Sequence, residues 1–152
     1  GIGIDRITSG AVVDEMRQTD HKGIFACGNV LHVHDLVDYV TLEAQLAGKG
    51  AADYILGKSD ENPCYVNGTT GNGVRYLVPQ RVNINNKDDV KIYFRVGRVF
   101  KNAKVVLEVD GKVISSKKKV KLAPGEMENV VIPADILSTM TADSSIVVRV
   151  EE

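Results

Sequence analysis

The chain has 152 residues, of which 43% are hydrophobic and 26% are charged, and this composition is typical of a globular protein with one moderate core or two small ones. Its formal net charge of −1 gives no reason to expect binding to nucleic acid or to an anionic membrane. No stretch reaches the ~18 apolar residues of a membrane span. The beginning, GIGIDRITSG, has neither an initiating Met nor a basic-then-apolar leader, so we expect an internal start, as in a fragment.

Charge and composition divide the chain into two parts. Residues 1–62 carry 5 Lys and Arg against 10 Asp and Glu, a net charge of −5, whereas residues 63–152 carry 14 against 10, a net charge of +4. An acidic part joined to a basic part suggests two units of different origin. We therefore predict an α+β fragment with one unit over residues 1–60 and another over 61–152, joined by the linker-like stretch GKSDENP.

The first unit reads as a β-hairpin followed by a long helix. AVVDE (residues 11–15) and GIFACGN (residues 23–29) predict two short strands, and a helical pattern runs from Leu36 to Leu56. Asp35 is placed to cap the helix, because its carboxylate can accept an unpaired backbone N–H. Asp38 adds negative charge to the first turn, where the helix dipole favours it.

One face of the predicted helix is apolar and built mostly from small residues. Residues at helical spacing form this stripe: Val37, Val40, Ala44, Ala47, Ala51 and Ile55. Such a stripe is costly to leave in water. We expect it to be covered by a second copy of the chain, by folding back on the second unit, or not to be ordered, and we favour a homodimer through residues 36–56.

The second unit changes to the two-residue period of β-strands. DVKIYFRV (residues 89–96) alternates apolar and polar side chains, and Asp110-Gly111 is a strong signal for a tight hairpin. Pro79 indicates a strand edge or break, and the lysines of SSKKKVK (residues 115–121) are typical of an edge strand. Seven to nine short strands predict an antiparallel β-sandwich of immunoglobulin-like type over residues 61–152.

The first unit resembles the carboxy-terminal part of the FAD domain in the pyridine nucleotide-disulfide oxidoreductase family of flavoproteins. In that family a Thr, an apolar strand and Ala-x-Gly-Asp form the second FAD-contacting motif. QTDHKGIFACGNV (residues 18–30) has Thr19 at the start and Ala-Cys-Gly-Asn at the end. GAVVDE (residues 10–15) and EAQLAGKGAADYI (residues 43–55) are similar to the family's preceding hairpin and following helix. The resemblance covers roughly residues 3–57.

The resemblance implies specific flavin contacts. Gly28 corresponds to the glycine that lets the backbone approach the ribityl-phosphate arm of FAD. Asn29 stands where the family has an Asp that binds ribityl hydroxyls, so it would make that contact without charge. The backbone amides of Leu36, Val37 and Asp38 correspond to the helix start that faces the flavin ring, where unpaired N–H groups and the dipole favour negative charge.

Other parts of the family's site are missing from these residues. There is no GxGxxG loop to bind the pyrophosphate, no redox CxxC and no nicotinamide-binding half. The resemblance therefore implies an inactive fragment of an FAD-dependent oxidoreductase that uses a nicotinamide nucleotide, NAD or NADP. The alternative is a non-catalytic interaction or structural module, in which the sandwich docks a partner subunit and the first unit only packs against it.

Two further features have alternative interpretations. His32, His34 and Asp35 spell HxHD, which fits the polar lining of a flavin pocket, plain surface histidines, or a metal site completed by Cys27 or His21. We favour the pocket lining, because no other residues have ligand spacing. Two cysteines are too few for a disulfide framework, so we expect reduced thiols in a cytoplasmic protein, with Cys27 packed in the interior.

Overall fold

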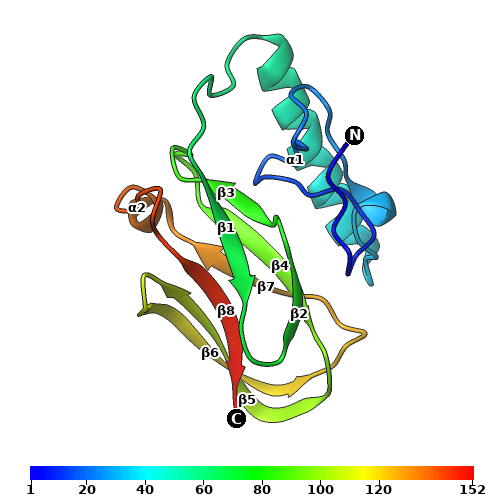
Figure 1. The fold of residues 1–152 in the computed structure, drawn as a ribbon. Coiled ribbons are helices and arrows are strands. Elements are labelled where there is room, and N and C mark those ends of the chain that lie inside the picture. Colours follow the sequence, from blue (N-terminus) through cyan, green and yellow to red (C-terminus); the bar gives the residue numbers. More distant parts are fainter.

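The computed structural model describes residues 1–152 and contains eight strands and one long helix (Figure 1). The strands are β1 (Tyr65–Thr70), β2 (Val74–Val78), β3 (Arg81–Asn83), β4 (Val90–Val96), β5 (Phe100–Val109), β6 (Lys112–Leu122), β7 (Glu128–Ile132) and β8 (Ile146–Glu151). The helical elements are the 3₁₀ turn η1 (Gly28–Val30), α1 (Val37–Ile55) and α2 (Ala134–Leu137). The chain is thus a mixed α/β fold in which strands predominate.

The strands form two sheets with a shared core. One sheet has the order β3-β1-β8-β5-β6 and the other the order β2-β4-β7. A cluster of 21 buried hydrophobic residues, all between Val66 and Val150, includes side chains from both sheets. The strands pair antiparallel except β1 and β8, which are parallel. The prediction of a purely antiparallel arrangement is therefore wrong at this one pair, where the first and last strands of the unit meet.

Several local predictions for the second unit are confirmed. The β4 residues Val90, Ile92, Phe94 and Val96 are buried in the core. Asp110 and Gly111 connect β5 to β6 with φ angles of 52° and 75°, the left-handed conformation of a tight hairpin turn. The lysine-rich strand β6 lies at the edge of its sheet, where charged side chains hinder pairing with another chain.

The predicted hairpin of the first unit is not formed by regular strands. Residues 11–15 and 23–29 make only isolated bridges, Ala11 to Ile4, Val13 to Thr19 and Phe25 to Gln18. Asp14 Oδ1 accepts hydrogen bonds from the amides of Met16 and Gln18 and so closes a tight turn. This turn prevents residues 11–15 from continuing as a regular strand. This segment is a series of turns held by single bridges.

The long helix is present, but its start and its buried face differ from the prediction. It begins after Leu36 without a side-chain cap, and the Asp35 carboxylate instead accepts the Met127 amide at 3.2 Å. The helix residues buried against the chain are Glu43, Ala47 and Gly50, a line rotated away from the predicted stripe. No helix of the structure has both the length and the apolar character needed to cross a membrane.

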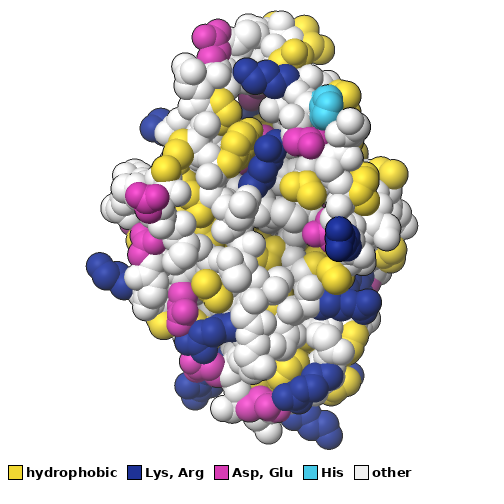
Figure 2. Space-filling model, in the orientation of Figure 1, with side chains coloured by type: hydrophobic (Ala, Val, Ile, Leu, Met, Phe, Trp, Pro, Cys, Tyr) yellow, Lys and Arg dark blue, Asp and Glu magenta, His cyan; other side chains and the backbone are white.

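Residues 1–57 cover part of the outer face of the β2-β4-β7 sheet. Val13 and Leu31 form a small buried cluster with Tyr76 and Val78 of β2. Figure 1 shows α1 and the amino-terminal turns lying beside the strands on that side. The first unit has therefore folded back on the second. The space-filling view in Figure 2 shows Lys and Arg side chains gathered over the lower, strand-rich part of the molecule, in keeping with its positive net charge.

Candidate functional site

A buried cluster of charged and ionisable side chains lies between the amino-terminal turns and α1. Glu43, near the middle of the helix, is at its centre, and the side chains of Arg17, His32 and His34 surround it. All four side chains are 2% exposed or less. Groups of this kind are rarely buried unless they are paired, so the cluster is the strongest candidate for a functional site.

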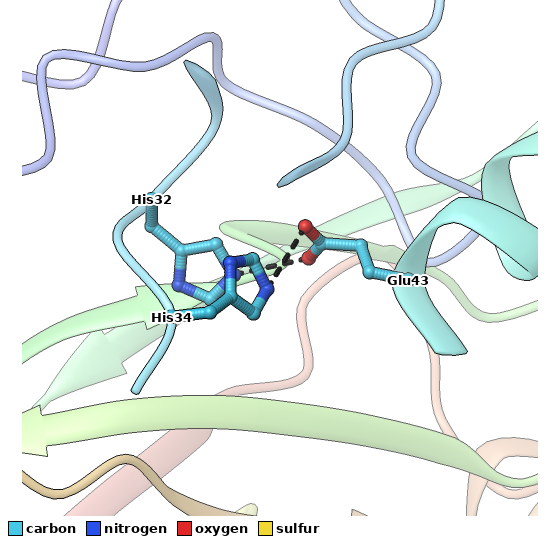
Figure 3. Close-up of side chains that lie close together, drawn as sticks. All are labelled: His32, His34 and Glu43. Atoms are coloured by element: carbon cyan, nitrogen blue, oxygen red, sulfur yellow. Dashed lines mark hydrogen bonds and ion pairs between the residues drawn. The ribbon is translucent and has the colours of Figure 1, made fainter. Parts of the chain in front are cut away.

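Two histidines approach the same carboxylate from one loop (Figure 3). His32 Nε2 lies 3.0 Å from Glu43 Oε1, and His34 Nε2 lies 3.2 Å from Oε2. The imidazole rings stand edge to face with their centroids 4.4 Å apart. In an extended strand these two residues, at i and i+2, would point to the same side of the chain, and the loop after η1 keeps that relation.

Two further donors hold the Glu43 carboxylate in place. Arg17 Nε donates to Oε1 at 3.0 Å, and the Gly28 amide donates to Oε2 at 2.8 Å. Arg17 lies in the turn after Asp14 with a φ of 68°, a conformation that costs free energy for any residue except glycine. The backbone of Arg17 is therefore strained, and in this conformation its guanidinium reaches Glu43 of α1.

The pKa values in the cluster follow from burial and from these contacts. Burial acts to raise the pKa of the Glu43 carboxyl, but the His32 hydrogen bond and the Arg17 charge outweigh it and lower the pKa. Burial lowers the pKa of His34, although the Glu43 charge opposes the shift. Glu43 is thus ionised and His34 neutral near pH 7.

Several polar atoms around Glu43 have no partner. Arg17 Nη2, His32 Nδ1 and His34 Nδ1 are buried and make no hydrogen bond. The cluster can act as a hydrogen-bonded network in which the Arg17 charge balances the charge of the Glu43 carboxylate. It also offers three atoms of the kind that bind transition metals, two imidazole nitrogens and a carboxylate oxygen.

The two residues assigned by resemblance to the ribityl arm lie next to this cluster. Gly28 has a φ of 73°, which favours glycine, and a Cβ built there would meet only Val40 Cγ1, at 3.9 Å. Asn29 Oδ1 accepts the His34 amide at 3.2 Å and closes the loop that carries both histidines. The Asn29 side chain is left with its NH₂ group free to donate.

The three residues assigned to the helix start lie on an open surface. Leu36 and Val37 are 53% and 79% exposed, and Asp38 is also exposed. Four clefts of the molecule are lined by other residues. The helix lies in contact with η1, and none of these four clefts lies between its start and η1.

The other residues considered for a metal site are not near the histidines' ligand atoms. Asp35 faces β4, with a carboxylate oxygen 3.7 Å from Arg95 Nη2. His21 lies in an exposed pair with Asp20. Cys27 is a free, partly buried thiol outside the group of convergent ligands.

Sequence reasoning missed Glu43 and Arg17. The signal available for Glu43 was a charged residue next to the small-residue stripe of the helix, in a position expected to be apolar or exposed. Arg17 gave no comparable signal, because its burial depends on the left-handed turn that follows Asp14. Arg17 and Glu43 are 26 positions apart, so their pairing leaves no local pattern in the sequence.

A second group of buried carboxylates lies on the other side of the amino-terminal turns. Asp14 Oδ2 accepts the Tyr65 hydroxyl at 2.9 Å, and Glu15 Oε2 accepts the Asn83 amide at 2.9 Å. Burial, with the neighbouring Asp14 charge, raises the pKa of Glu15 to about 7. These contacts fasten the first unit to β1 and β3.

Comparison with protein-family models, with curated proteins and with solved structures finds no match to this chain.

Proposed function

We propose that this chain is the carboxy-terminal part of an FAD-dependent oxidoreductase that uses a nicotinamide nucleotide. In this proposal residues 1–57 supply the ribityl and isoalloxazine side of the flavin site, and residues 61–152 are an immunoglobulin-like sandwich. FAD, when bound, would carry electrons from the nicotinamide nucleotide to an acceptor. The protein would be cytoplasmic, which agrees with the two free cysteines.

The observation that carries the proposal is the position of the Gly28–Asn29 turn beside the first half of α1. The Gly28 amide is bound to Glu43 Oε2 at 2.8 Å, so the turn is held against the helix. A ligand arm lying along the turn would then reach the helix start. The residues present fit such a ligand, because glycine occupies a left-handed position and the amino end of α1 has no side-chain cap.

Each proposed contact has a defined chemical role. Asn29 would donate its free NH₂ group to a ribityl hydroxyl while its oxygen keeps the His34 amide. The amides of Leu36, Val37 and Asp38 would face the flavin ring and favour the negative charge that develops there on reduction. The apolar residues Val33 and Val37, which are 65% and 79% exposed, would be covered by the rest of the flavin domain.

The full-length protein encoded by the gene tests the proposal. We expect it to be yellow when purified, whereas the 152-residue chain alone should be colourless and should not bind added FAD with submicromolar affinity. Gly28→Val should remove flavin from the full-length protein, and Asn29→Ala should weaken binding by about 0.5–1.5 kcal/mol, as for one neutral hydrogen bond. Gly57→Val is the matched control, because Gly57 also has a positive φ, 68°, and a Cβ there meets nothing within 4 Å.

A flavin-free full-length protein would contradict the proposal and favour the interaction module, in which the sandwich docks a partner subunit. Normal flavin content in a folded Gly28→Val protein would show that the turn does not contact the cofactor. Circular dichroism of each variant separates loss of flavin from loss of folding.

A further inference from the structure

The ligand atoms of His32, His34 and Glu43 have the spacing of a metal site. The two nitrogen-to-oxygen distances are 3.0 Å and 3.2 Å, and the candidate ligand atoms all lie within 4.8 Å of one another. In a tetrahedral zinc site, bonds of about 2.0–2.1 Å place neighbouring ligand atoms roughly 3.3 Å apart. Both histidines present the same nitrogen, Nε2, to the carboxylate (Figure 3).

Hydrogen bonding accounts for only one of the two histidine contacts. His32 Nε2 and Glu43 Oε1 meet the geometry of a hydrogen bond. His34 Nε2 lies 3.2 Å from Oε2 without an aligned hydrogen bond. The lone pair of a neutral imidazole nitrogen in this position can bind a metal ion that the carboxylate also binds.

The surroundings of Glu43 supply the outer contacts that metal-binding carboxylates need. Arg17 Nε and the Gly28 amide donate to its two oxygens and fix its orientation. Because Arg17 adds positive charge beside the ion, we expect weaker affinity than that of a site built from thiolates. The three ligand side chains are 1–2% exposed, so water does not compete freely for the ion.

We propose that His32 Nε2, His34 Nε2 and the Glu43 carboxylate bind one divalent transition-metal ion of the zinc class. Two imidazoles and a carboxylate suit Zn²⁺ far better than Mg²⁺ or Ca²⁺, which take oxygen ligands. The ion would tie the loop after η1 to the middle of α1. The site adjoins the proposed flavin contacts at Gly28 and Asn29, but its ligands are other residues and its test requires no flavin.

The test uses the tag-free 152-residue chain, stripped of metal with a chelator. Zn²⁺ is titrated calorimetrically, Mg²⁺ serves as the hard-cation control, and the visible absorption of added Co²⁺ reports tetrahedral coordination. A Cys27→Ser/Cys64→Ser background excludes binding by the free thiols. In that background His32→Ala and His34→Ala remove one ligand each, and His21→Ala removes the exposed histidine as a matched control.

We expect one Zn²⁺ per chain, a rise in the melting temperature on adding Zn²⁺, and no response to Mg²⁺. Binding should be unchanged in His21→Ala and lost in His32→Ala and His34→Ala. Absence of one-to-one binding in the unsubstituted chain would overturn the proposal by itself, even if the alanine variants fail to fold. Binding that survives in both His32→Ala and His34→Ala would overturn it as well.

Discussion

The Gly28 amide donates a 2.8 Å hydrogen bond to Glu43 Oε2, so a turn of the amino-terminal segment is fastened to the middle of a helix fifteen residues further along the chain. Oε1 of the same carboxylate accepts hydrogen bonds from Arg17 Nε and His32 Nε2. One buried side chain therefore joins three separate segments. Loss of its charge is the change to which this part of the fold should be most sensitive.

Glu43→Gln should destabilise the chain by about 3–5 kcal/mol, because it keeps the shape of the side chain but leaves the Arg17 guanidinium buried without a counter-charge. Both side chains are 1% exposed, so water cannot replace the lost partner. Urea unfolding followed by circular dichroism measures the difference. Glu61→Gln, in the exposed connection after α1, is the control and should change little. A loss below about 1 kcal/mol would show that the pair contributes no more than a surface ion pair.

Gly28→Ala should cost about 1–2 kcal/mol, because residue 28 has a φ of 73° and a Cβ is disfavoured in the left-handed region. Gly48→Ala is the matched comparison. Gly48 lies in α1, and a Cβ there meets nothing within 4 Å, so alanine should stabilise the chain by about 0.5–1 kcal/mol. Thermal unfolding of the two variants should give shifts of opposite sign. A Gly28→Ala variant as stable as the unsubstituted chain would mean that the left-handed turn at Gly28 is not maintained in solution.

Three local features of the second unit could be predicted from the sequence because their signals are local. Alternation in β4, the Asp110-Gly111 turn and the lysines of β6 each depend on neighbouring residues, and each is confirmed. The parallel pairing of β1 with β8 could not be predicted in this way. It joins Gly68 to Ile146, residues that only the whole topology brings together.

The cluster around Glu43 was predictable only in part, for a similar reason. HxHD drew attention to His32 and His34, but the pattern pointed to Asp35 as a helix cap. The structure uses Asp35 differently, because the Met127 amide and Arg95 compete for its carboxylate from the second unit. A tertiary contact thus overrides the local preference of Asp35 to cap the helix. The central position of Glu43 depends on the folded arrangement of three segments and leaves no local pattern in the sequence.

The second unit should fold without the first. Its 21-residue core lies entirely between Val66 and Val150, so a segment of residues 63–152 retains all of it. Truncation would expose Tyr76 and Val78, which the first unit covers, and should therefore lower the melting temperature without removing cooperativity. A thermal scan of the isolated segment measures this. A melt without a cooperative transition would show that the core depends on residues 1–62.

We also predict that the chain dimerises through residues 36–56. Within the apolar stripe Val37 and Ile55 are 79% and 81% exposed, although Ala47 is buried by the chain itself. A contact between two identical helices would cover both ends of the stripe. Sedimentation at micromolar concentration should show a dimer that Val37→Lys/Ile55→Lys dissociates. Val120→Lys, at an 82% exposed position on β6, should leave the dimer intact. A monomeric unsubstituted chain with an ordered helix would contradict the prediction.

The buried Glu15 carboxyl should make the folded chain less stable as the pH rises, the opposite of the effect of most carboxyls. Burial, with the neighbouring Asp14 charge, raises its pKa from 4.5 to about 7 in the folded chain. Between these two values the folded state binds more protons than the unfolded state, so the contribution of Glu15 to the free energy of unfolding decreases as the pH rises. Across that window the decrease should be about 3 kcal/mol, since one pKa unit corresponds to about 1.4 kcal/mol.

Glu15→Gln isolates this effect, because a Gln oxygen can still accept the Asn83 amide while the side chain stays neutral. The free energy of unfolding of each protein is measured by urea denaturation between about pH 5 and about pH 8. The variant should lose less stability than the unsubstituted chain as the pH rises, and above about pH 7 it should be the more stable of the two. Other carboxyls, including Asp14, titrate in both proteins, so only the difference between the two curves reports Glu15. Parallel curves over the whole range would mean that Glu15 has an ordinary pKa and is hydrated in the folded chain.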